Sequence, residues 1–162
     1  MEEIELVFGE VDAAISVMRE VSKWGRGRGY RLWPDEWLTR EELLTEEAGP
    51  ENFCVGKLGD AVVCAFILQW SDREYWAAAP KYEAAYLHKF CVVREYAHHG
   101  MTKAVVEALK KECRKRGIKR IRLDTALDEQ IIRKIYLNAG FRIVDIIDFD
   151  NGRSMALYEL DV

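Results

Sequence analysis

The sequence lacks the features that mark several large classes of protein. Its four cysteines stand singly with no Cys-x-x-Cys pair, and it has only three prolines. This pattern favours reduced thiols in a core over a disulfide framework or a zinc site. The longest apolar run, residues 61–68, is far shorter than the roughly 20 residues of a membrane-spanning helix. The acidic start Met-Glu-Glu-Ile-Glu does not resemble a signal peptide. We therefore expect a cytoplasmic protein with no membrane partner.

The chain also has no excess of positive charge. It carries 24 Lys and Arg against 28 Asp and Glu, a net charge of −4. Such a protein has no global positive field to attract nucleic acid, although it tolerates a cationic substrate such as an amine. A composition of 49% hydrophobic and 32% charged residues is typical of a globular protein. The length of 162 residues is close to the ~150 of one domain, so we expect a single domain over residues 1–162.

Hydrophobic periodicity and turn residues predict alternating strands and helices. Apolar residues from Val11 to Val21 recur at helical spacing, and three glycines within 25–29 favour the end of that helix and a flexible loop. Thr39 and Glu42 have the spacing of a capping box. The predicted order is strand 4–8, helix 11–24, helix 39–48, strands 53–58, 61–70 and 86–93, helix 101–116, strand 118–124, helix 129–139, and strands 141–149 and 154–160.

The segment of residues 93–103 is the most informative for function. It is predicted to connect a strand to a long amphipathic helix that begins after Gly100. Unpaired backbone N–H groups and the positive end of the helix dipole at such a junction favour binding of phosphate. Most strand-to-helix loops bind nothing, so this junction alone does not define a function.

Residues 86–141 resemble the GNAT N-acetyltransferase superfamily. The match comprises the strand 86–92, the following loop and long helix, the strand 120–124, and the ending Tyr136-Leu-Asn-Ala-Gly140-Phe141. The tryptophan-bearing segment 24–37 is similar to a branch of small bacterial members whose substrates are mostly unassigned. The resemblance implies an α/β fold with a mixed central sheet flanked by helices, in the order β-α-α-β-β-β-α-β-α-β-β.

The resemblance also implies an activity. Members of this family transfer an acetyl group from acetyl-coenzyme A to a primary amine, here of a small molecule or a peptide, by direct attack in a ternary complex. Homodimers are common in the family, so a second copy of the chain is a candidate partner. Two alternatives remain open: a non-catalytic module that binds or senses acyl-coenzyme A, and a protein-interaction domain that keeps only the fold.

The same resemblance places the donor on the central strand and the loop after it. The strand backbone at Phe90, Cys91 and Val92 would pair with pantetheine, and the loop residues Ala97, His98, His99, Gly100, Met101 and Thr102 would hold the pyrophosphate. Of the three anchor positions of the family loop, only Gly100 is intact, and His98 stands where glycine is common. Glu129 occupies the position of a frequent asparagine at the start of the next helix.

Candidates for acid and base catalysis follow from the chemistry of amine acetylation. Tyr136 matches the family tyrosine that protonates the leaving thiolate, with a packing role as the alternative. His88 and Glu83 are candidates to accept the proton of the amine, as are Asp72 and Glu74. Asp124 is interpreted as a family acidic position or a helix cap, and Cys91 as a packing residue. No metal site is expected, because the adjacent side chains of His98 and His99 diverge.

Several cationic and aromatic side chains have two interpretations. Four tryptophans could line an acceptor pocket, because aromatic faces attract cations, or pack in the core; they are Trp33, Trp37, Trp70 and Trp76. Arg26 and Arg28 could bind an anionic group of the acceptor or lie solvated in the glycine-rich loop. The basic residues 110–116 are most simply a solvated helix face.

Overall fold

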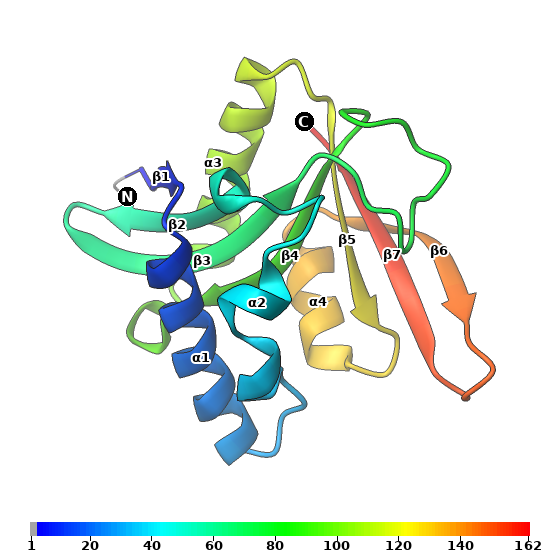
Figure 1. Ribbon diagram of the computed structural model, residues 1–162, viewed down its shortest axis with the longest axis horizontal. Coiled ribbons are helices and arrows are strands. Elements are labelled where there is room, and N and C mark those ends of the chain that lie inside the picture. Colours follow the sequence, from blue (N-terminus) through cyan, green and yellow to red (C-terminus); the bar gives the residue numbers. More distant parts are fainter. Residues whose placement is uncertain (1–2) are drawn as a thin grey trace. The chain divides into compact units, whose positions relative to one another are not determined.

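The computed structural model describes residues 3–162 and confirms the predicted order of strands and helices. The elements are β1 (Glu5–Phe8), α1 (Val11–Gly27), α2 (Arg40–Leu43), β2 (Phe53–Leu58), β3 (Ala61–Gln69), β4 (Ala85–Val92), α3 (Met101–Lys115), β5 (Arg120–Ala126), α4 (Gln130–Asn138), β6 (Arg142–Asp148) and β7 (Ser154–Asp161), as labelled in Figure 1. Three short 3-10 helices also occur, at Asp35–Trp37, Pro50–Asn52 and Arg94–Tyr96. Within residues 3–162, no helix combines the length and the apolar character that crossing a membrane requires.

The strands form a mixed sheet in the order β1-β2-β3-β4-β5-β7-β6. The chain divides into two compact units, which are described separately below. The first unit comprises residues 1–69 and 89–108, and the second comprises residues 70–88 and 109–162. Strand β4 contributes its last half to the first unit and its first half to the second.

In the first unit, α1 packs on strands β2 and β3. The periodic apolar residues of α1 are buried, among them Ala14 and Met18, which have no exposed surface. They join a core that contains Phe53 of β2 and Ile67 of β3. The β2–β3 hairpin turns at Gly59, whose φ of 59° lies in the left-handed region that a tight turn of this type requires. The hairpin prediction is therefore confirmed.

Two helix boundaries differ from the sequence prediction. Helix α1 continues to Gly27 instead of ending before Gly25. Gly25 is a packing residue inside the helix: Leu32 lies so close that a Cβ at position 25 would come within 2.1 Å of its Cδ1. Helix α2 begins as predicted, with the Thr39 hydroxyl accepting a hydrogen bond from the N–H of Glu42. It ends at Leu43 instead of residue 48, because Thr45 and Ala48 form a turn with two mutual hydrogen bonds.

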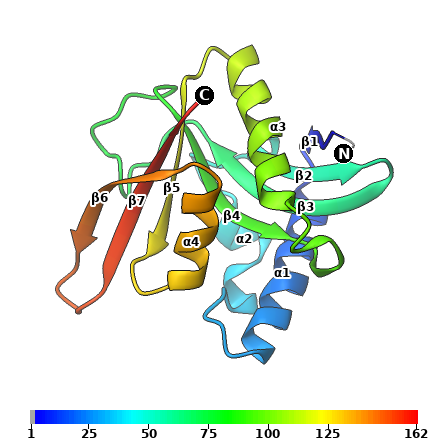
Figure 2. The same ribbon diagram turned by 180° about the vertical axis from the view of Figure 1, so that it is seen from behind.

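In the second unit, β7 pairs with β5 on one side and with β6 on the other, both antiparallel (Figure 2). The β5–β7 register runs without interruption from Arg120↔Asp161 to Ala126↔Met155. The turn Asp150-Asn151-Gly152 closes the β6–β7 hairpin as the sequence predicts. Residues 71–84 form an irregular segment before β4, which is also as predicted.

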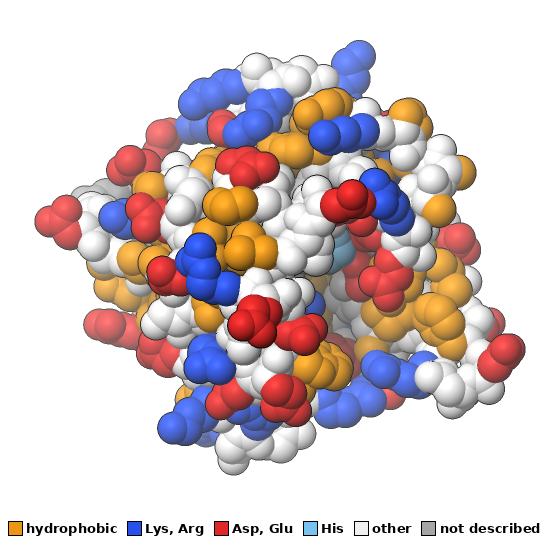
Figure 3. Space-filling model, viewed as in Figure 1, with side chains coloured by type: hydrophobic (Ala, Val, Ile, Leu, Met, Phe, Trp, Pro, Cys, Tyr) orange, Lys and Arg blue, Asp and Glu red, His pale blue; other side chains and the backbone are white. Residues whose placement is uncertain are grey.

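On the face seen in Figure 3, acidic and basic side chains are interspersed. The small negative net charge of the chain is therefore not gathered there into one large patch of a single sign. Recognition of a charged ligand on this face must then depend on local groups, because no broad field there attracts it.

Candidate active site

The segment between β4 and α3 has an unusual backbone. After the 3-10 turn Arg94–Tyr96, Ala97 is extended, and His98 and Gly100 both have left-handed φ angles, 67° and 70°. Helix α3 starts at the next residue, Met101. The position where the family commonly has glycine therefore has a glycine-like conformation in this chain, although it is occupied by histidine. A side chain in this conformation costs about 1–2 kcal/mol.

Two arginine side chains near this segment pack on the ring of Trp24 of α1. The guanidinium of Arg94 lies 3.7 Å from the centroid of the Trp24 ring, and that of Arg28 lies 5.1 Å from it. Arg94 Nη2 is also 3.5 Å from His98 Nε2. The Trp24 ring therefore makes cation–π contacts with both Arg28 and Arg94. Arg94 also contacts His98, the left-handed residue in the turn before α3.

The arginines of the glycine-rich segment are held in place, contrary to the expectation of a flexible solvated loop. Arg26 donates hydrogen bonds to the carbonyl of Trp33 and to Asp35 Oδ1, the latter at 3.1 Å. Arg28 lies over Trp24, as described above. Trp33 itself contacts Lys89, whose Nζ is 5.2 Å from the ring centroid. These contacts join α1 to the segment after it.

Strand β4 changes its character along its length. The parallel register with β5 consists of the pairs Ala85↔Ile121 and Tyr86↔Arg122. Lys89 then has a φ of 54°, which interrupts the regular strand conformation. Past the strand end, the N–H of Val93 donates to the carbonyl of Val63 on β3. The predicted pantetheine-binding residues 90–92 thus follow an irregularity in the strand, in the half that belongs with β3.

The four cysteines are free and buried, which confirms the prediction of reduced core thiols. Burial raises the pKa of Cys64 to about 12 and raises that of Cys91 further above its ordinary value. The Cys91 thiol lies 3.9 Å from the carbonyl of Ala65. A thiol of this kind remains protonated and does not act as a nucleophile near neutral pH.

In the second unit, His88 of β4 lies between two carboxylates. Its Nε2 is 3.3 Å from Asp72 Oδ2, and its Nδ1 is 3.9 Å from Oδ1 of Asp124, which lies in the C-terminal half of β5. Asp72 is held by the N–H groups of Glu74 and Tyr75, which donate to its Oδ1. Burial raises the pKa of Asp72, but the contact and charge of His88 and these two N–H groups lower it more, so it lies below its ordinary value.

Glu83 is engaged by Arg122, a residue that the sequence analysis did not single out. Arg122 is buried on β5 and donates to Glu83 Oε2 at 2.8 Å, to Glu159 Oε2 at 2.9 Å and to the Tyr86 hydroxyl at 2.9 Å. The signal for it was an arginine between two apolar residues, Ile121 and Leu123, inside a predicted strand. Glu83 is therefore paired with the buried cation Arg122. His88, in contrast, lies beside the carboxylates of Asp72 and Asp124.

Tyr136, the predicted general acid, lies on α4 among aromatic rings. Its ring centroid is 5.8 Å from that of Phe141 and 6.2 Å from that of Tyr158. Tyr158 is fully buried, and its hydroxyl shares a hydrogen bond with the Thr125 hydroxyl. Glu129 is the residue immediately before α4, and its side chain makes no capping hydrogen bond. The aromatic contacts orient the Tyr136 ring, which suits either a packing or a catalytic role.

The tryptophans differ in their surroundings. Trp76 lies against Tyr86, with ring centroids 5.3 Å apart, and close to Arg122. Trp70 lies beneath Arg116, whose guanidinium is 4.5 Å from the ring centroid. Trp37 is 56% exposed and belongs to neither group. Arg116, a member of the predicted solvated helix face, thus contacts an aromatic ring although its side chain is 41% exposed.

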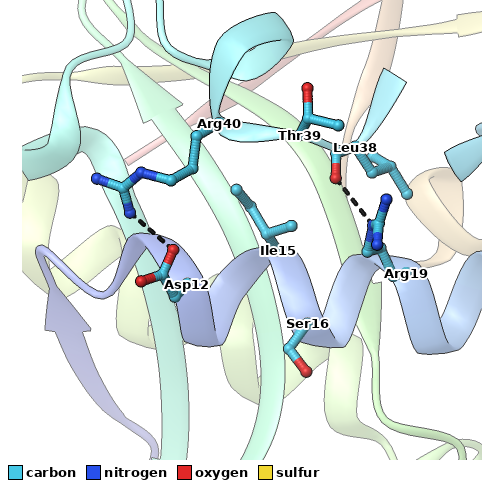
Figure 4. A pocket seen from close by; sticks show the side chains of 7 residues that line it. All are labelled: Asp12, Ile15, Ser16, Arg19, Leu38, Thr39 and Arg40. Carbon is cyan, nitrogen blue, oxygen red and sulfur yellow. Dashed lines mark hydrogen bonds and ion pairs between the residues drawn. The ribbon is translucent and has the colours of Figure 1, made fainter. Parts of the chain in front are cut away.

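A hollow of about 440 Å³ lies between α1 and the segment that precedes α2 (Figure 4). It is lined by Asp12, Ile15, Ser16, Arg19, Leu38, Thr39 and Arg40. Figure 4 shows that its charged groups are already engaged: Arg40 pairs with Asp12 at 2.7 Å, and Arg19 Nε donates to the carbonyl of Leu38. The hollow therefore offers few groups that could position a reacting ligand.

Comparisons with solved structures show that the chain shares its fold with several acetyltransferases. A GNAT-family acetyltransferase from Listeria monocytogenes is 19% identical over 98% of this chain and 95% of that one, with a TM-score of 0.74. The PaiA N-acetyltransferase from Thermoplasma acidophilum, solved in complex with coenzyme A, is 20% identical over 99% of both chains, with a TM-score of 0.68. An acetyltransferase from Bacillus subtilis, also in complex with CoA, is 19% identical over 100% and 99%, with a TM-score of 0.64.

No curated protein matches the chain by sequence. The sequence model of the acetyltransferase (GNAT) family, in contrast, matches residues 17–141, which is more than half of the chain. This range includes the left-handed turn before α3, His88 and its two carboxylates, and Tyr136. The fold, the order of elements and the family match agree, and the chain belongs to the GNAT acetyltransferase family.

Proposed function

We propose that the protein is an N-acetyltransferase that moves the acetyl group of acetyl-coenzyme A to a primary amine of a small molecule or a peptide. The observation that carries this proposal is the backbone before α3, where His98 and Gly100 are left-handed and the helix begins at once. Backbone N–H groups at such a turn, together with the positive end of the helix dipole, favour binding of an anion. A pyrophosphate is the group of coenzyme A that suits such a site.

The rest of the donor follows the strand. The backbone of Phe90, Cys91 and Val92 pairs with pantetheine, and the residues 97–102 hold the pyrophosphate, with Glu129 near the start of α4 as a further contact. The short β4–β5 register, which comprises only Ala85 and Tyr86 on β4, supports this role because it does not include residues 90–92. The structures of the relatives from T. acidophilum and B. subtilis contain coenzyme A, which supports the same donor.

The reaction requires a base for the amine and an acid for the thiolate. His88 accepts the proton of the amine, because its nitrogens face carboxylates that compensate the positive charge of the imidazolium. The neutral amine attacks the thioester carbon, the C–S bond breaks, and the Tyr136 hydroxyl gives its proton to the sulfur. The excess proton on the new amide nitrogen then returns to the Tyr136 oxygen, which restores the hydroxyl. Glu83 is the weaker candidate for the base, because it is paired with Arg122.

The first experiment tests the donor by thermal unfolding with acetyl-coenzyme A. A ligand that binds only the folded state raises the melting temperature by mass action, by an amount that corresponds to about 2.7 kcal/mol at a concentration 100 times the Kd. Gly100→Asp should abolish the shift, since it places a side chain and a negative charge at a left-handed position of the loop. Gly152→Asp is the matched control, a left-handed glycine in the β6–β7 turn. No shift at millimolar ligand contradicts the proposal.

The second experiment separates catalysis from binding alone. Release of the coenzyme A thiol is measured across a panel of primary amines, with alcohols of the same carbon skeleton as controls. Thiol release that depends on an amine supports the transferase. A protein that binds acetyl-coenzyme A and releases no thiol with any amine is instead the acyl-coenzyme A binding or sensing module.

A further inference from the structure

Three polar side chains from three elements meet in the second unit. They are Asp72 of the irregular segment before β4, His88 of β4 and Asp124 of β5. One ligand-type atom of each lies within 4.8 Å of the other two. The side chains are 5%, 22% and 16% exposed, so water reaches them only in part. Such a convergence of buried acceptors is uncommon unless a ligand or a proton compensates it.

The facing atoms of Asp72 and His88 have no partner besides each other. Asp72 Oδ2 and His88 Nε2 are buried and 3.3 Å apart, and neither makes a hydrogen bond to another group. The other oxygen of Asp72 is occupied by the N–H groups of Glu74 and Tyr75. If the Nδ1 proton of a neutral His88 faces Asp124, the Nε2 lone pair faces a carboxylate oxygen. A donor of two hydrogen bonds that lies beside this pair, without entering between the two atoms, would reach both of them.

Carboxylates outnumber cations among the titratable groups around the cluster. Glu74 and Tyr75 of the irregular segment and Tyr86 of β4 act on it directly, and Tyr86 is in turn next to Glu83 and to Arg122 of β5. Arg122 is the only cation among them, and it is engaged by Glu83 and Glu159. Burial and the charges of Asp124 and Glu74 raise the pKa of Tyr75, in agreement with a negative local potential.

We propose that Asp72, His88 and Asp124 form the pocket that receives the amino group of the acceptor, which enters as an ammonium ion. This inference rests on the proposed function and assigns the acceptor end of the same site. An ammonium has three N–H donors, and the cluster presents two carboxylate oxygens and one ring nitrogen as acceptors. One positive charge between two carboxylates is the state that the cluster favours.

The same geometry accounts for activation of the amine. An N–H bond of the ammonium breaks, its electron pair stays on the amine nitrogen, and the proton forms a new N–H bond at His88 Nε2. The total charge of the pocket is unchanged, because the positive charge only moves from the amine to the ring, where Asp72 and Asp124 still compensate it. The neutral amine then has the lone pair that attack on the thioester requires.

The proposal is tested first by binding, without reliance on turnover. n-Butylammonium is titrated into the protein while the ring nitrogens of the histidines are followed by ¹⁵N NMR, with His88→Gln used to assign the signal of His88. We expect a saturable change at His88, weakened tenfold or more in Asp72→Asn and Asp124→Asn, because each loses a charge-assisted hydrogen bond. Asp12→Asn, at an exposed carboxylate of α1, should bind as the parent does. n-Butanol should cause no change.

Kinetics with the best amine of the panel give a second readout. Asp72→Asn and Asp124→Asn should raise KM for the amine about tenfold or more, with unchanged affinity for acetyl-coenzyme A by calorimetry. His88→Gln should lower kcat, because it removes the ring nitrogen that accepts the proton of the amine. Melting curves of all variants identify any loss of folding.

The possible outcomes distinguish this inference from the proposed function. An unchanged His88 signal in n-butylammonium, or equal binding in the parent and Asp72→Asn, overturns the ammonium pocket. Tight stoichiometric binding of Zn²⁺ that excludes n-butylammonium overturns it in favour of a metal site. Binding of n-butylammonium without acetylation of any amine retains the pocket and contradicts the acetyltransferase. Acetylation of amines with an unchanged KM in both Asp72→Asn and Asp124→Asn supports the acetyltransferase and contradicts the ammonium pocket.

Discussion

The loop at residues 97–102 and the cluster of Asp72, His88 and Asp124 are built on different principles. The loop offers its backbone: two left-handed residues and a helix start, with exposed histidine side chains. The cluster offers side chains from three elements, largely buried and in contact. A backbone site tolerates substitutions, since any residue that adopts the required φ keeps the N–H groups. A side-chain site does not, so changes of sequence should have unequal effects in the two regions.

The largest effect is expected on stability, at the buried Arg122 of β5 in the second unit. Arg122→Met removes from Glu159, whose side chain is 10% exposed, the one buried member of its cationic partners, and leaves only Arg142 and Arg120 at more exposed positions. Breaking a buried pair in this way costs about 3 kcal/mol of unfolding free energy. Urea unfolding measures the loss, and Arg116→Met is the control, because Arg116 is 41% exposed and should change stability far less. Equal losses of unfolding free energy in the two variants would show that the buried ion pairs of Arg122 stabilise the fold no more than an exposed arginine does.

The next effect concerns chemistry rather than folding. Tyr136→Phe keeps the ring and its contacts with Phe141 and Tyr158 but deletes the hydroxyl. Turnover should fall by about 100-fold if the hydroxyl protonates the thiolate, with the affinity for acetyl-coenzyme A little changed. Steady-state kinetics and calorimetry measure the two quantities. Unchanged turnover in an assay limited by chemistry would leave Tyr136 a packing residue.

A smaller effect should appear in the pH dependence of stability. The folded-state pKa of Asp72 is lower than its unfolded value, so its carboxylate stabilises the folded protein above the unfolded pKa of about 3.9. This contribution is lost as the pH falls through the folded pKa. Asp72→Asn should therefore reduce the unfolding free energy by about 1–2 kcal/mol at pH 6, and the difference from the parent should shrink below pH 4. Chemical denaturation at several pH values tests this expectation, and a difference that is constant with pH would contradict it.

The smallest effect is expected in the backbone region. His98→Gly removes a side chain from a φ of 67°, which glycine adopts without strain, and so should tighten binding of coenzyme A at pH 8 by about fivefold, equivalent to roughly 1 kcal/mol. Calorimetry of the parent and the variant measures this. Identical affinities in the two proteins would mean that His98 points away from the donor.

The sequence predicted much of the fold because burial on one face leaves a local pattern. The periodic apolar residues of α1 and the glycine turn of the β2–β3 hairpin could be located in this way. Helix ends were less predictable, because the role of Gly25 depends on Leu32, which reaches it only in the folded chain.

The candidate site could be predicted only in part, for the same reason. The resemblance located the loop at residues 97–102 and Tyr136, because these are local motifs. The grouping of Asp72, His88 and Asp124 depends on three elements that folding brings together. Each of the three was noted as a single candidate, and their contacts, like those of Arg122, leave no local signal.

The left-handed conformation at Lys89 has a consequence for the comparison of related sequences. In a regular strand, alternate residues share a face, so the orientation of one residue determines that of all the others. The left-handed Lys89 interrupts this alternation between its chain neighbours His88 and Phe90. The two halves of β4 can therefore diverge independently in evolution, and inward and outward positions in homologues have to be counted afresh after this residue.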